Sequence, residues 1–82
     1  MSHEAGTSSE EKLVYMANQI AGFFQTMDDE EAVAGVADHI NKFWEPRMRR
    51  QLFRIIERGC DGLKPLVLKA AKQINQPEDM RA

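Results

Sequence analysis

The stretch DHINKFWEPRMRR, from Asp38 to Arg50, decides how this chain folds. Pro46 has no backbone N–H and its ring clashes with the preceding turn, so a helix that contains Trp44 must end there. Proline suits the first position of a helix, and a second helix is therefore predicted to begin at Pro46. The only tryptophan thus lies close to a dense group of arginines at one corner between two helices. These arginines are Arg47, Arg49 and Arg50.

Apolar residues recur at spacings of three and four on both sides of this corner, which is the pattern of helices with one buried face. The acidic run from Asp28 to Glu31 is typical of a helix start, because carboxylates suit free N–H groups and the positive end of the helix dipole. Gly59 and Gly62 can adopt the positive φ that ends a helix. The sequence predicts an all-α fold, a small bundle of about four short helices joined by tight turns, near 9–27, 30–44, 46–58 and 64–75.

The expected organisation is one helical domain over residues 9–75, between a disordered polar tail over 1–8 and a polar tail over 76–82. Ser8 and Glu11 match the spacing of a capping box at the start of the first helix. The residues expected in the core are Leu13, Ile20, Phe24, Val33, Val36, Ile40, Leu52, Ile55, Val67 and Ala70.

The length and composition argue against a self-contained enzyme. A chain of 82 residues forms one small domain, and a deep pocket of about 300–1,000 Å³ is hard to build in it. Its single cysteine, Cys60, allows neither an intrachain disulfide nor a cysteine-based zinc site. This usage fits a reducing compartment, and no run approaches the roughly 20 apolar residues of a membrane span. We therefore expect a cytoplasmic protein that does not enter a membrane.

The net charge of −2 hides a strong asymmetry. Residues 1–45 hold nine acids against two lysines, whereas residues 46–74 hold eight bases against two acids. Four of these bases are spaced to share one helix face, and three interpretations stay open: a solvated face, docking onto an acidic or polar protein surface, or a grip on a phosphate-rich ligand. The four are Arg47, Arg50, Arg54 and Arg58.

No catalytic or metal-binding group is predicted. His39 could act as a base or pair with Cys60, yet no activated nucleophile is evident, and a structural or contact role is the simpler interpretation. Asp38 and Lys42 stand one turn apart and are expected to form a surface ion pair. Trp44 has two interpretations that the sequence leaves open, a core residue or an exposed anchor for a partner.

Three segments carry a resemblance to a known family: KLVYMANQIAGFF, AVAGVADHINKFWEPRMRRQL and GLKPLV. They resemble the delta subunit of soluble NAD-dependent formate dehydrogenase over roughly Lys12 to Ala71. The resemblance implies a small accessory subunit, not an enzyme on its own, that binds and stabilises the large alpha subunit in a complex with beta and gamma subunits. The candidate contact residues are Asp38, His39, Lys42, Trp44, Arg47, Arg49, Arg50 and Arg54.

The same resemblance implies that this chain binds no cofactor directly. The bis-pyranopterin guanine dinucleotide with molybdenum or tungsten, the FMN, the iron–sulfur clusters and the NAD would belong to the other subunits. Two alternatives stay open: a maturation factor that aids insertion of the pterin cofactor, and a small helical nucleic-acid-binding module. We expect no nucleic-acid binding, because the N-terminal half is strongly acidic.

Overall fold

The computed structural model describes residues 5–59 and 62–77, and over these ranges it contains helices and no strand. Helix α1 spans Ala5–Phe24, α2 spans Asp29–Phe43, α3 spans Pro46–Glu57 and α4 spans Pro65–Ala70. A short 3-10 helix, η1, continues α4 over Ala71–Gln73. The all-α prediction is confirmed, and Pro46 and Pro65 each stand at the first turn of a helix.

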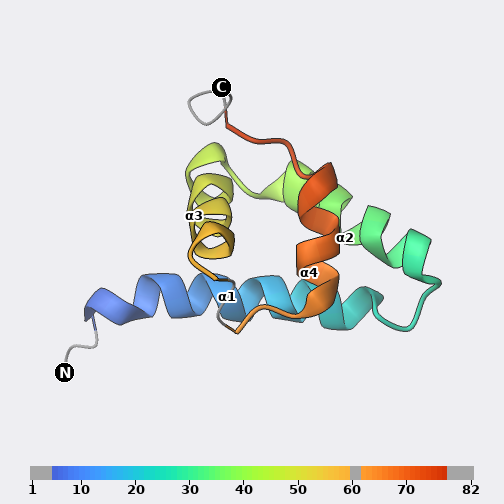
Figure 1. Cartoon of the computed structure of the whole chain (residues 1–82), viewed down its shortest axis with the longest axis horizontal. Helices are drawn as coiled ribbons and strands as arrows, with labels where there is room; N and C mark the ends of the chain where they lie inside the picture. The colour runs from blue at the N-terminus through green and yellow to red at the C-terminus, as the bar shows by residue number, and fades with distance from the viewer. Residues whose placement is uncertain (1–4, 60–61, 78–82) are drawn as a thin grey trace.

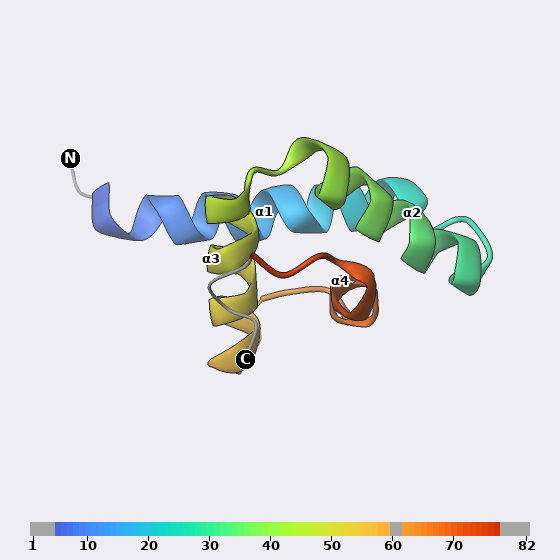
Figure 2. The same ribbon diagram turned by 90° about the horizontal axis from the view of Figure 1, so that it is seen from above.

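The long helix α1 runs across one side of the molecule, and α3 and α4 stand across it (Figure 1). Helix α2 turns back from the end of α1 and packs against both α1 and α4. Seen from above, α3 and α4 extend to the same side of α1 (Figure 2). Lys69 of α4 forms an ion pair of 3.1 Å with Asp29, which joins α4 to the first turn of α2.

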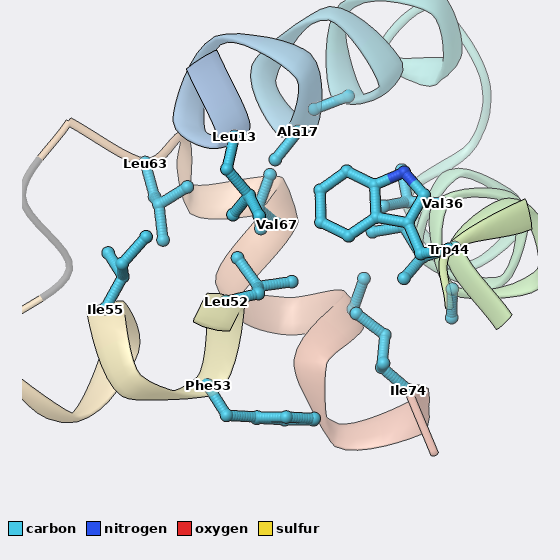
Figure 3. Close-up of a cluster of buried hydrophobic side chains, with 14 of the residues drawn as sticks. Leu13, Ala17, Val36, Trp44, Leu52, Phe53, Ile55, Leu63, Val67 and Ile74 are labelled. Carbon is cyan, nitrogen blue, oxygen red and sulfur yellow. The ribbon is translucent and has the colours of Figure 1, made fainter. Parts of the chain in front are cut away.

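The core lies between the four helices and includes Val36, Leu52 and Val67 (Figure 3). Eight of the predicted core residues are buried, whereas Ile20 and Phe24 are partly buried and pack against the cluster. Burial of such aliphatic side chains contributes about 1.5–3 kcal/mol each, which makes this cluster the main source of stability. The confirmed core residues are Leu13, Val33, Val36, Ile40, Leu52, Ile55, Val67 and Ala70.

The packing of α1 on α2 depends on Gly35. A Cβ atom at this position would lie 2.6 Å from two ring carbons of Phe24. Glycine therefore lets the Phe24 ring lie directly on the α2 backbone. Phe23, on the outer side of α1, rests edge-on against Phe24 with ring centroids 5.0 Å apart.

Several predicted boundaries differ from the structure. Helix α1 begins at Ala5, so residues 5–8 are helical rather than part of a tail, and Ser8 stands at an interior position of the helix rather than at its start. The helix ends at Phe24, three residues before Met27. Asp28 holds the N-cap position of α2 without a side-chain cap hydrogen bond. Gly59 and Gly62 adopt φ of 125° and 82°, as predicted, while Cys60 and residues 1–4 and 78–82 lie outside the described residues.

Candidate partner-binding surface

Trp44 belongs to the core. Only 5% of the residue is exposed, and its indole points into the cluster formed by α1, α3 and α4 (Figure 3). The backbone N–H of Trp44 donates to the Ile40 carbonyl at 2.9 Å, which closes the last turn of α2. The open question about Trp44 is thus decided for the core, and the expectation that its side chain anchors a partner is wrong for this folded state.

The side chain of Arg49 forms hydrogen bonds within the chain. Its Nε donates to the Trp44 carbonyl at 3.2 Å, and its Nη1 donates to the Asn75 carbonyl at 2.5 Å. One guanidinium therefore ties the corner between α2 and α3 to the segment that follows η1. Its planar fork of donors suits two carbonyls at once. This internal role was not predicted from the sequence, and the contact role of Arg49 stays a prediction.

Two asparagines make similar ties that the sequence analysis did not predict. Asn41 donates from Nδ2 to the Gln73 carbonyl at 3.1 Å and accepts at Oδ1 from the Asn75 N–H at 2.8 Å. On the other side of α4, Asn18 donates to the Gly62 carbonyl at 2.8 Å and accepts from the Lys64 N–H at 2.9 Å. Each side-chain amide thus satisfies a backbone donor and a backbone acceptor. The partners lie 32 to 46 residues away, so local sequence patterns hold no signal for these contacts.

The basic face of α3 is exposed and concave. Arg47, Arg50, Arg54 and Arg58 line one surface depression of about 560 Å³, together with Gln51 and two acids, Glu10 and Glu57. This confirms that the four arginines share a face. At one end of the depression, Glu10 of α1 forms an ion pair with Arg58. Positive charge therefore concentrates toward Arg47 and Arg54.

The remaining candidate residues lie on the outer part of α2. Lys42 and Asp38 form the predicted ion pair at 3.2 Å, with their side chains about two-thirds exposed, a setting in which such pairs contribute little to stability. His39 lies against the Phe43 ring, with ring centroids 4.7 Å apart. Phe43 itself is 71% exposed, which makes it one of the two most exposed large apolar residues of the described chain.

Among the residues that the structure describes, no group of three or more His, Cys, Asp and Glu side chains is placed to hold a metal ion. Pairing of His39 with Cys60 falls outside the described residues. In the same part of the chain, none of the helices has the length and apolar content to cross a membrane. The chemistry that this surface offers is charged and aromatic contact.

The comparisons with known proteins give one family. The family model of the NADH-dependent formate dehydrogenase delta subunit, FdsD, matches residues 12–71. This match runs from Lys12 in α1 through the end of α4 and so covers most of the helical body. No curated protein and no solved structure matches the chain. The chain therefore belongs to the family of NADH-dependent formate dehydrogenase delta subunits.

Proposed function

We propose that this chain is a non-catalytic accessory subunit that binds and stabilises the large catalytic subunit of a soluble, molybdenum- or tungsten-containing formate dehydrogenase in the cytoplasm. The family supports membership in a formate dehydrogenase assembly. The small size supports a binding role, because a chain of 82 residues has little material with which to build a deep substrate pocket.

The observation that carries the proposal is the exposed arginine face of α3. Arg47 and Arg54 are exposed, and the side chain of neither forms an ion pair or hydrogen bond within the described part of the chain. Arginine is enriched among residues that anchor protein interfaces. Charges that are not used for folding can steer a partner and fix its register.

The proposed contact residues are three arginines of this face and three candidates on the outer part of α2. They are Asp38, His39, Lys42, Arg47, Arg50 and Arg54. Trp44 and Arg49 would support these residues indirectly, since the buried Trp44 and its hydrogen bond with Arg49 fix the corner between α2 and α3. A corner that is already rigid loses little conformational entropy on binding, which favours affinity.

In this proposal the pterin-bound metal, the flavin, the iron–sulfur clusters and the NAD are held by the other subunits. The chain acts on the reaction indirectly, by keeping the large subunit folded around its own cofactor. A subunit that binds the native state of its partner raises the stability of that state by mass action.

The test is purification of the complex with and without this chain. We expect the chain to elute with the active complex in a fixed ratio on size exclusion. Without the chain, the remaining subunits should keep their metal and pterin content but lose activity at a lower temperature. Absence of the chain from the mature complex, together with loss of the pterin cofactor in its absence, would instead support a maturation factor.

A further inference from the structure

We infer that the arginine depression on α3 receives an acidic helical segment of a protein, with two carboxylates spaced two helical turns apart. The inference rests on the proposed function, because the segment is assigned to the large subunit. The two residues that would bind the carboxylates of this segment are Arg47 and Arg54.

The molecule itself shows how such a segment engages this face. The N-terminal part of α1 crosses the C-terminal end of α3, where Glu10 pairs with Arg58. The neighbouring Ser9 accepts at Oγ a hydrogen bond of 3.2 Å from Gln51 Nε2. Two successive residues of α1 thus contact Gln51 of α3 and its C-cap residue Arg58, which lie seven residues apart. This intramolecular contact fills one end of the depression with a helical carboxylate.

Arg47 and Arg54 repeat this spacing, and neither guanidinium is paired with a carboxylate of the described chain. Arg47 and Arg54 are also seven residues apart, which corresponds to two turns and about 10.5 Å along the helix axis. A partner helix with acids at positions i and i+7 presents its carboxylates at the same interval. The two guanidinium groups would each take one carboxylate in a bidentate contact.

The geometry favours carboxylates over a phosphate group. A phosphate is compact and needs donors that converge on one point, whereas Arg47 and Arg54 leave the helix two turns apart. Glu10 and Glu57 line the same depression and would repel a doubly charged phosphate more than a single carboxylate. A longer segment with spaced single charges avoids this repulsion.

Calorimetry with the purified large subunit tests the charge requirement. The full chain is compared with the double variant Arg47→Gln/Arg54→Gln and with Lys12→Gln/Lys72→Gln. The lysine variant removes the same charge from two exposed positions outside the depression. We expect the arginine variant to bind at least about tenfold more weakly in low salt, and the lysine variant to stay within about threefold of the wild type. Equal losses of affinity in the two variants would show that the arginines contribute only general electrostatic attraction, and this result would overturn the inference.

Zero-length carbodiimide coupling then identifies what lies on the depression. The variant Arg54→Lys places a reactive amine at this position, and mass spectrometry finds the carboxylate to which it becomes joined. The inference requires coupling to an Asp or Glu of the large subunit within a segment that carries a second acid seven residues away. Coupling to a second copy of this chain would overturn it, as would a complex that forms normally without any coupling.

Two further results separate the inference from the proposed function. Failure of the wild-type chain to bind the large subunit at all would remove the proposed function. Normal binding that is unaffected by Arg47→Gln/Arg54→Gln would remove only the inference. Tight binding of inorganic pyrophosphate to the free chain, lost in this double variant, would show that the depression selects phosphate instead.

Discussion

The guanidinium of Arg49 lies 2.5 Å from the carbonyl oxygen of Asn75, across 26 residues of chain. The same side chain binds the Trp44 carbonyl, so α3 holds both the end of α2 and the segment after η1. Arg49→Ala removes both contacts and leaves two carbonyls without this donor. We expect a loss of about 2 kcal/mol in the free energy of unfolding, measured by urea denaturation.

Arg47→Ala is the matched control for Arg49→Ala. It removes the same side chain two positions away on α3, where the residue is exposed. Its effect on the free energy of unfolding should stay within about 0.5 kcal/mol. Equal destabilisation by the two variants would contradict the structural role assigned to Arg49.

Asn41 and Arg49 hold the same residue, Asn75, through its N–H and its carbonyl respectively. Once one tie is removed, the segment moves away and the second tie loses its partner. The double variant Asn41→Ala/Arg49→Ala should therefore be less destabilised than the sum of the single variants, by about 0.5 kcal/mol or more. A double-mutant cycle from thermal or urea unfolding measures this coupling, and strict additivity would argue against a shared tie.

Two glycines of neighbouring helices should respond to alanine with opposite signs. At Gly35 a Cβ meets the Phe24 ring at 2.6 Å, so Gly35→Ala must displace that ring and should cost about 1–3 kcal/mol. At Gly22 a Cβ meets nothing within 4 Å, and Gly22→Ala should stabilise α1 by about 0.5–1 kcal/mol. Thermal midpoints that shift in the same direction would show that the packing of α1 on α2 is wrongly placed.

Ile40 is fully buried and is among the largest such side chains of the core. Ile40→Ala should destabilise the fold by about 2–4 kcal/mol, through lost transfer energy and the cavity that remains. Phe43→Ala, three residues along α2, truncates a side chain that is 71% exposed and should have little effect. Circular dichroism during thermal unfolding compares the two variants, and an unchanged midpoint for Ile40→Ala would contradict the placement of Ile40.

Helix type and number follow from local rules in this sequence. Apolar spacing, the prolines at 46 and 65 and the positive-φ glycines act within a few residues of each other, and the structure follows them. The start of α1 was predicted too late, because small polar residues from Ala5 onward gave no apolar period although they are helical. Aliphatic core positions were also predicted well, since each lies on the one face that its helix can bury.

The candidate surface was harder to predict, because burial at a helix end depends on distant segments. Trp44 follows the last turn of α2, and only the arrival of α3 and α4 encloses its indole. Arg49 sits among four other arginines in sequence, yet its partner carbonyls come from two separate loops. In the sequence, Asn18 and Asn41 cannot be distinguished from surface polar residues, because their backbone partners lie far away along the chain.

The ties made by Asn18 and Asn41 bear on the order in which the chain folds. Helix α4 has six residues. This is too few for a stable isolated helix, because the first turn loses more conformational entropy than its single hydrogen bond offsets. The segments that flank α4 are held by side chains from α1, α2 and α3, over separations of 26 to 46 residues. Such non-local contacts are expected to form after the local α1–α2 hairpin, because loop closure slows them. We therefore expect helix α4 to be the last helix to fold, and a nascent chain released before residue 75 would lack the Asn75 contacts that fasten it.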